Sequence, residues 1–169
     1  MAQHLPESIR TVAIIGGGPA ASTLAVLLAR AGIRVGLWHK PKSAPLIVGE
    51  SLVPAIIPML RRLGVEDEVR KYSTLKPGAT FNLTPDIAFS FFFENLKGLP
   101  RYAYNVPRDK FDHTLLEAAQ TAGAAVFETA AEVSRVPGTD RVELSAATLA
   151  ATGGFFTHAP DLIVDATGR

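Results

Sequence analysis

The sequence predicts an α/β fold in which a parallel sheet flanked by helices is joined to a small antiparallel β layer. An apolar, β-branched run at 12–15 leads through three glycines into an alanine-rich helical pattern. Between residues 79 and 106 the apolar residues recur at every second position, which is typical of half-buried strands. Residues 162–164 form a short, wholly apolar run of the kind found in buried parallel strands.

The first strand–turn–helix unit is organised around glycines. Gly16 allows a tight turn after the strand, and Gly18 lets backbone N–H groups approach a pyrophosphate. Ala21 fills the third position of the G-x-G-x-x-G/A fingerprint, where a small side chain permits close helix–strand packing. Phosphates would lie at the helix N-terminus, where N–H groups and the helix dipole favour anions. The pattern is typical of a dinucleotide-binding, Rossmann-like βαβ unit; the alternative is a glycine-rich turn of another α/β protein.

The helix of this unit is predicted at 19–31, with Gly32 as the residue that ends it. The spacing of its apolar residues predicts an inward face made of Leu24, Leu27, Leu28 and Ala31. A second strand follows at 33–38. Such strands usually end in Asp or Glu, which bonds the adenosine ribose. This chain has His39 there, and a neutral imidazole can still bond a hydroxyl.

A second helical pattern is predicted at 51–63, with Ser51 as its N-cap and Gly64 ending it. Its apolar residues on one side are Ile56, Met59, Leu60 and Leu63. Pro58 lies inside the pattern, so we expect a kink or a broken first turn. A short charged helix is expected at 66–71.

The antiparallel layer is predicted from three strands, at 79–83, 87–93 and 101–106, and is assigned to a substrate-side region. Phe89, Phe91 and Phe93 share one face of the middle strand, and Phe92 lies on the other. These rings have two interpretations. They could form an apolar wall for an aromatic substrate, but core packing is expected for most of them.

The next helix is predicted at 107–122, closed by Gly123, with Phe111, Leu115, Ala118 and Ala119 facing inward. Arg108 lies in its first turn, where a cation opposes the helix dipole. A nearby anion, such as a cofactor phosphate, would explain this arginine; a solvated surface arginine is the alternative. Further strands are predicted at 125–128, 132–136 and 141–146, and residues 155–158 are a candidate to pair with them.

The composition excludes several classes of function. The chain has 169 residues, of which 47% are apolar and 20% charged, as in a globular domain. With 17 Lys and Arg against 16 Asp and Glu, no charge excess indicates nucleic acid. The absence of cysteine excludes disulfides and thiolate chemistry and favours the cytoplasm. The four histidines are too scattered for a metal motif, and no apolar run could span a bilayer.

Five stretches of the sequence together resemble the flavin-dependent halogenases and their relatives, the single-Rossmann FAD monooxygenases. They are VAIIGGGPAA at 12–21, GESLVP at 49–54, KPGATF at 76–81, VPRDKFD at 106–112 and DATGR at 165–169. The first is shared by many flavoproteins, whereas GESLVP is similar to the more specific G-E-S-x-x-P segment of the halogenases. The third resembles the segment that carries the family's active-site lysine. The likeness covers nearly the whole chain and corresponds to the N-terminal part of that family.

The resemblance implies an enzyme with FAD as cofactor. It implies a cofactor site made of Gly16, Gly18, Pro19, Ala20, His39, Glu50, Ser51, Arg108, Asp165 and Gly168. The loop at 41–51 would link the flavin and substrate regions. In the halogenases a flavin hydroperoxide oxidises halide, and the hypohalous acid formed reaches a lysine beside an electron-rich aromatic substrate. Lys76 is the matching position.

Without the resemblance, the sequence around Lys76 predicts an ordinary loop lysine before Pro-Gly. Its chemistry nevertheless suits the role, because an ammonium can hydrogen-bond hypohalous acid and a neutral amine can form a haloamine. Partial burial would lower a lysine pKa and make both states accessible. The implied partners are a separate flavin reductase and a small aromatic substrate, either free or attached to a carrier or other protein.

The sequence departs from the family pattern at His39, in lacking an arginine before Gly49, and in ending at the DATGR motif. We therefore expect an incomplete FAD-binding domain, either a fragment or a natural half-enzyme. Two other functions stay open. One is an FAD monooxygenase that hydroxylates an aromatic substrate or protein side chain, and the other is a truncated flavoprotein without catalysis.

Overall fold

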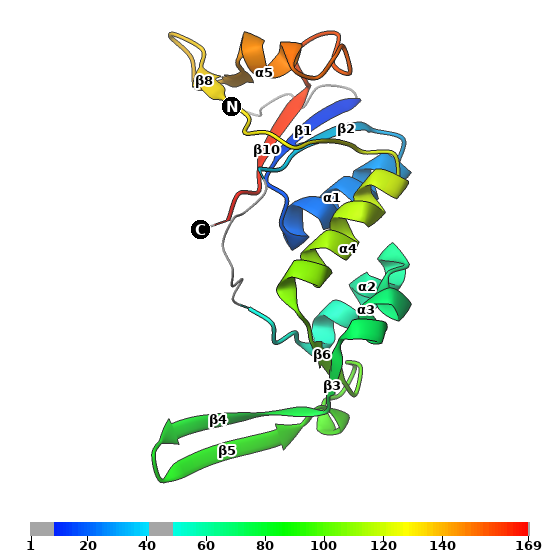
Figure 1. Cartoon of the computed structure of the whole chain (residues 1–169). Helices are drawn as coiled ribbons and strands as arrows, with labels where there is room; N and C mark the ends of the chain where they lie inside the picture. Colours follow the sequence, from blue (N-terminus) through cyan, green and yellow to red (C-terminus); the bar gives the residue numbers. More distant parts are fainter. Residues whose placement is uncertain (1–8, 41–48, 169) are drawn as a thin grey trace. The chain divides into compact units, whose positions relative to one another are not determined.

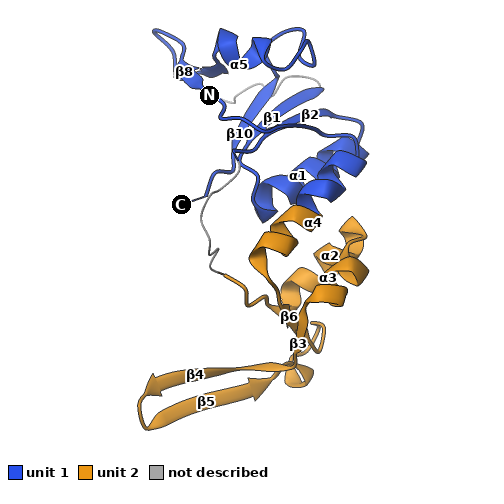
Figure 2. Cartoon of the chain, in the orientation of Figure 1, with its two compact units in different colours: residues 1–43, 115–169 blue, residues 44–114 orange. Residues whose placement is uncertain are grey.

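The computed structural model describes residues 9–40 and 49–168, which divide into two compact units. Unit 1 comprises residues 1–43 and 115–169, and unit 2 comprises residues 44–114 (Figure 2). Unit 1 contains a parallel sheet, and unit 2 contains helices with small antiparallel sheets (Figure 1). This confirms the predicted fold class. The assignment of residues 79–106 to a substrate-side region stays a prediction.

The sheet of unit 1 has four parallel strands in the order β10-β1-β2-β7. They are β1 (Thr11–Ile15), β2 (Arg34–Trp38), β7 (Ala125–Phe127) and β10 (Leu162–Asp165). The chain leaves β1 toward β2, while β10 pairs with the opposite edge of β1. Ligands of open parallel sheets bind at the carboxyl ends of the strands at such a switch point. The predicted burial of 162–164 is wrong: β10 is an edge strand, and Ile163 and Val164 are only half-buried.

Helix α1 (Pro19–Arg30) follows the glycine turn as predicted, and Gly32 has φ +81° after the Ala31 C-cap. Its predicted inward face is wrong. The leucines of that face are half-buried and Ala31 is exposed, whereas the buried residues are Ala21, Ser22, Ala25 and Val26. The prediction favoured the longest apolar side chains, but close approach of a helix to a sheet selects the smallest ones.

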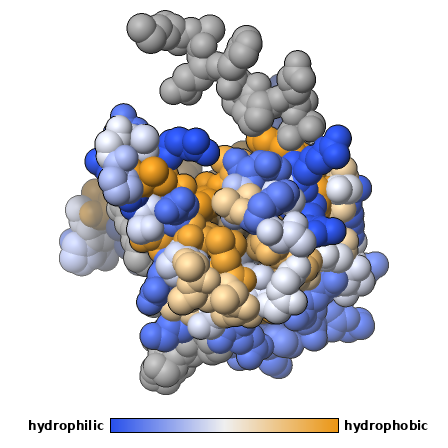
Figure 3. All heavy atoms as spheres, turned by 90° about the horizontal axis from the view of Figure 1, so that it is seen from above, coloured by the Kyte–Doolittle hydropathy of each residue, from blue (hydrophilic) through white to orange (hydrophobic). Residues whose placement is uncertain are grey.

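The remainder of unit 1 is a hairpin of β8 (Val133–Arg135) and β9 (Val142–Leu144), followed by α5 (Ala146–Ala150). Helix α5 was not predicted; it begins where Ser145 Oγ accepts a bond of 3.1 Å from the Thr148 N–H. Residues 155–158 form no strand. Instead Phe156 stacks on Trp38, with 5.9 Å between ring centroids. Phe155, the residue before Phe156, is only half-buried. The view from above shows apolar atoms at the surface of the molecule (Figure 3).

The helices of unit 2 follow the predicted pattern, apart from the N-cap and the buried face of the first one. The elements are the 3-10 turn η1 (Pro54–Ile56), α2 (Ile57–Leu63) and α3 (Glu66–Tyr72). The broken first turn before Pro58 is confirmed, and Gly64 ends α2 with φ +79°. Ser51 is not a helix N-cap, which corrects that prediction; it forms an antiparallel bridge to Asn105. The buried stripe of α2 is Ile57, Leu60 and Leu63, so Ile56 and Met59 are not its core.

Helix α4 (Arg108–Thr121) matches the predicted helix at 107–122. Three of its four predicted inward residues, Phe111, Leu115 and Ala119, are buried. Ala118 is half-buried. Gly123 follows with φ +103°, as expected for a residue that ends a helix.

The strands of unit 2 form two separate pairs rather than one layer. One pair joins β3 (Thr74–Lys76) to β6 (Ala103–Asn105), and the other is the hairpin of β4 (Gly78–Thr84) and β5 (Ile87–Phe92), which precedes the turn η2 (Phe93–Asn95). Strand β3 was not predicted. Phe93 is 3% exposed, but Phe89 and Phe92 are each 56% exposed. Core packing therefore accounts for Phe93 and not for most of these rings.

Candidate functional site

The glycine turn is held tightly between the ends of its neighbouring strands. The Gly16 N–H donates to the Trp38 carbonyl at 2.9 Å, and the Ala166 N–H donates to the Ile15 carbonyl at 2.8 Å. Gly16 has φ +125°, and a Cβ there would lie 2.3 Å from the Ala166 oxygen. Only glycine fits both conditions. The turn is thereby fixed at the carboxyl edge of the sheet, where β1, β2 and β10 end.

The next two glycines differ in what surrounds them. A Cβ at Gly17 would lie 2.0 Å from His39 Nδ1, whereas a Cβ at Gly18 would meet no atom within 4 Å. Gly18 is the N-cap of α1, no side chain caps that helix end, and no acidic residue lies in its first turn. Pro19 has no N–H to satisfy. An open backbone at a 12-residue helix's uncapped N-terminus fits an anionic pyrophosphate.

Asp165 and Gly168 lie where the chain leaves β10, beside the glycine turn. Asp165 pairs in register with Ile15, the residue before Gly16. Its carboxylate accepts bonds from the Thr167 N–H at 3.0 Å and the Thr167 hydroxyl at 2.7 Å, and these bonds lower the pKa of Asp165. The carboxylate therefore shapes a local turn, which Gly168 continues with φ +75°.

In unit 2 the GESLVP segment extends the small sheet of β3 and β6. The Leu52 N–H donates to the Tyr104 carbonyl at 2.9 Å, and the Val106 N–H donates to the Glu50 carbonyl at 2.8 Å. Strand β6 thus pairs with β3 along one edge and with this segment along the other. Alternation along the strands puts the side chains of Lys76 and Ser51 on the same face.

Lys76 reaches across that face to the GESLVP segment. Its Nζ donates to Ser51 Oγ at 2.6 Å and to the Leu52 carbonyl at 3.1 Å. The same nitrogen lies 5.4 Å from the centroid of the Phe93 ring, within range of a cation–π interaction. Ala103 pairs with Lys76 in register and has only a methyl group, so the long side chain can pass over it. Lys76 is a half-buried strand residue, which corrects its interpretation as an ordinary loop lysine.

Arg108 is held by residues of its own unit. Its Nε and Nη2 donate to the two carboxylate oxygens of Asp112, at 2.9 and 3.1 Å, and its Nη1 donates to the Gly49 carbonyl at 3.5 Å. The Arg108 and Asp112 side chains are only 18% and 17% exposed. The solvated alternative for Arg108 is therefore wrong. Its charge is balanced by Asp112, and its contact with the cofactor stays a prediction.

The predicted site residues fall into two groups. Unit 1 brings together Gly16, Gly18, Pro19, Ala20, His39, Asp165 and Gly168. Unit 2 brings together Lys76 and Ser51, with Glu50 beside them, and joins Arg108 to Gly49. Most of the predicted linking loop at 41–51, and Arg169 of the DATGR motif, lie outside the described residues. The sequence analysis missed Leu52 and Phe93 as partners of Lys76, because a strand of three residues is too short to show a period in the sequence.

A buried carboxylate in unit 2 was also missed. Glu66 is 7% exposed and accepts bonds from Tyr102, from Arg61 Nε at 2.7 Å and from Arg70 Nη2 at 3.4 Å. Burial alone would raise the pKa of Glu66, but the Tyr102 and Arg61 hydrogen bonds outweigh it and lower that pKa. Tyr104 of β6 also donates to Glu66, at 3.3 Å, so the cluster joins α2 and α3 to β6.

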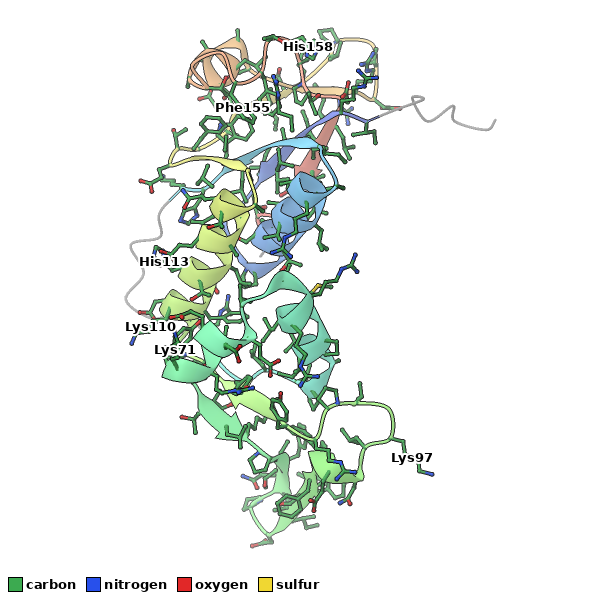
Figure 4. The ribbon with its side chains drawn as sticks, turned by 90° about the vertical axis from the view of Figure 1, so that its right-hand side faces the viewer. Lys71, Lys97, Lys110, His113, Phe155 and His158 are labelled. Carbon is green, nitrogen blue, oxygen red and sulfur yellow. The ribbon has the colours of Figure 1, made fainter. Side chains whose placement is uncertain are left out.

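Other kinds of site find little support in the described residues. Within 9–40 and 49–168, no three His, Asp or Glu side chains gather closely enough to hold a metal ion. Across the same residues, no helix combines the length and apolar character needed to cross a membrane. Lys97 projects away from the ribbon (Figure 4), unlike Lys76.

Comparison with known proteins gives a consistent set of matches. The sequence model of the FAD binding domain family matches residues 10–169. Tryptophan 2-halogenase from Chondromyces crocatus is 32% identical over 168 residues, which are 98% of this chain and 31% of that protein. The 1H-pyrrole-2-carbonyl-(peptidyl-carrier protein) chlorinase of Pseudomonas fluorescens is 38% identical over 136 residues, covering 69% of this chain and 30% of that protein.

A solved structure also matches the chain. The crystal structure of CmlS, a flavin-dependent halogenase, superposes with a TM-score of 0.70 at 33% identity, covering 82% of this chain and 26% of that one. The chain spans about a third or less of the length of these curated relatives and of this structure.

Proposed function

The chain belongs to the FAD binding domain family, and from this premise we propose that it is the FAD-binding part of a flavin-dependent halogenase with Lys76 as its catalytic residue. The proposed substrate is an electron-rich aromatic, either free or carrier-bound. The observation that carries the proposal is the 2.6 Å bond between Lys76 Nζ and Ser51 Oγ. It joins the two motifs that are most specific to the halogenases, although 25 residues separate them in the sequence.

FAD is the cofactor, and when bound it supplies the redox chemistry that oxidises halide at the expense of O₂. The residues of unit 1 would hold its pyrophosphate. The backbone at Gly18 is open to an approaching group, and α1, which begins at Pro19, presents the N–H of Ala20 in a first turn that no side chain caps. We assign His39, Asp165 and Gly168 to the same cradle. Glu50, Ser51 and Arg108 are also proposed as cofactor contacts, on the resemblance of their motifs to those of the halogenases.

The contacts of Lys76 suit a group that guides hypohalous acid. An ammonium has three donors, and two of them are used by Ser51 and Leu52. The third is available to the oxygen of a hypohalous acid molecule. In the proposed step the aromatic carbon forms a bond to the halogen as the O–halogen bond breaks. The leaving hydroxide is stabilised by the Lys76 N–H and forms water with the proton lost from the ring.

Replacing Lys76 by alanine tests this role. Halogenated product, measured by mass spectrometry with a flavin reductase and halide present, should be lost while oxidation of reduced flavin continues. Lys97→Ala is the matched control, because that lysine is exposed in the same unit and points away from the ribbon (Figure 4). Undiminished halogenation by the Lys76 variant would overturn the assignment.

The same assay separates the alternative functions. An oxygenated product that forms without halide would identify an FAD monooxygenase acting on an aromatic group. Normal flavin binding without any product would favour a flavoprotein that does not turn over. Dependence of product formation on an added reductase would support the proposed partner. A cytoplasmic enzyme is proposed, in keeping with the cysteine-free composition.

A further inference from the structure

The end of β2 has an unusual chemistry for a dinucleotide cradle. A carboxylate at this position accepts a hydrogen bond from the adenosine ribose and repels a phosphate attached to that ribose. Here the position holds His39, followed by the exposed Lys40. The described acidic residues nearest in the sheet are Asp165, whose carboxylate is bonded to Thr167, and Glu128, which follows β7. The end of β2 itself therefore offers hydrogen-bond donors and no negative charge.

The His39 ring is fixed in place by the glycine turn. Its backbone N–H donates to the Phe127 carbonyl at 2.9 Å, and its imidazole fills the space that a Cβ at Gly17 would need. The middle position of the G-x-G fingerprint ordinarily tolerates a side chain. In this chain it cannot, because the Cβ would lie 2.0 Å from Nδ1 and 2.4 Å from Cγ of His39. Gly17 and His39 are thus packed directly against each other, and the His39 ring lines the cradle next to the open backbone at Gly18.

We propose that His39, held over Gly17, makes the cradle tolerant of a phosphate on the adenosine ribose, so that 2′-phosphorylated adenine nucleotides bind where FAD binds. The inference rests on the proposed FAD site and extends its ligand class. An imidazole can donate to a ribose hydroxyl or to a phosphate oxygen, whereas a carboxylate can only accept. Lys40 is the next residue in the chain and adds a cation after β2, and position 39 carries no carboxylate to repel a phosphate.

The test compares two nucleotides on the full chain by isothermal titration calorimetry. The probes are ADP and ADP that carries a ribose 2′-phosphate. For the unaltered chain we expect the two dissociation constants to agree within about threefold. In the His39→Glu variant the phosphorylated probe should bind at least about tenfold more weakly than ADP, because the variant restores the repelling carboxylate. In the His39→Gln variant, which keeps a donor, the two dissociation constants should again agree within about threefold.

The Gly17 contact is tested in parallel. Gly17→Ala should weaken the binding of both probes, because the ring must move, and the same change in an His39→Ala background should have little further effect. The double variant also serves if Gly17→Ala alone does not fold, because it removes the clash. An unaltered chain that rejects the phosphorylated probe as strongly as His39→Glu would overturn the inference, as would an unperturbed Gly17→Ala. If ADP and FAD bind and only the phosphorylated probe fails, the proposed FAD site stands; if none of the three binds, both fail.

Discussion

Alanine at Gly16 and alanine at Gly18 should separate folding from cofactor binding. Gly16 is packed against the backbone of Ala166, and Gly18 faces open space. We expect Gly16→Ala to lower the free energy of unfolding. Gly18→Ala should instead leave the fold intact and lower the affinity for FAD. The two positions are two residues apart in one turn, so each variant is a control for the other.

The size of the first effect follows from the geometry. A positive φ costs a residue with a Cβ about 1–2 kcal/mol. The Cβ would lie 2.3 Å from the Ala166 oxygen and 2.6 Å from its carbonyl carbon, and backbone atoms cannot swing away as a side chain does. Overpacking of this kind costs about 1–3 kcal/mol. The free energy of unfolding should therefore fall by about 2–5 kcal/mol in the Gly16 variant.

The second effect has a different origin. Gly18 has φ −80°, which any residue can adopt, so alanine there loses only the preference for glycine at an N-cap, less than about 1 kcal/mol. Its methyl group would occupy the place where a pyrophosphate approaches the backbone, and FAD affinity should drop by about tenfold or more. Urea unfolding followed by circular dichroism and titration with FAD measure the two effects. Equal stability of Gly16→Ala and the unaltered chain, or unimpaired FAD binding by Gly18→Ala, would refute the reasoning.

Two further predictions concern unit 2. Glu66→Gln should lower the free energy of unfolding at neutral pH by about 1.5–3 kcal/mol, because charged hydrogen bonds are lost. The folded-state pKa of Glu66 is lowered, so its contribution is present above the ordinary value of 4.5 and disappears as the pH falls through the folded pKa. Urea unfolding over this acid range should therefore be less pH-dependent in the variant, and an equally steep loss would contradict the assignment. Arg108→Gln should weaken FAD binding by about tenfold, whereas Lys110→Ala on the exposed side of α4 should not; equal affinities in a flavin titration would remove Arg108 from the cofactor site.

Local sequence signals predicted the backbone of the site well. The glycine fingerprint located β1, the turn and α1, because the conformation of Gly16 and the proline at the helix start act within a few residues. Gly64 and Gly123 marked the ends of α2 and α4 for the same reason. The resemblance to halogenase segments, and not periodicity, is the basis on which Lys76 is proposed as the catalytic residue.

The failures share a dependence on partners distant in the sequence. Serine is a common helix N-cap residue, but Ser51 instead forms a β-bridge with Asn105 of β6, more than 50 residues later. Strand β3 has only three residues, too few to show a period, and it exists because β6 supplies its hydrogen bonds. The buried face of α1 was mistaken because packing distance against the sheet, and not hydrophobicity alone, decides which residues lie inward.

The β4–β5 hairpin bears on how this protein behaves in concentrated solution. Five of its apolar residues are more than half exposed, namely Phe81, Leu83, Ile87, Phe89 and Phe92. Residues 78–92 contain a single charged side chain, Asp86, and consist largely of residues that favour extended structure. Strand edges with this composition act as templates for intermolecular pairing and aggregation. We therefore expect intermolecular association through this hairpin, and a lysine in place of one of these exposed apolar residues should improve solubility.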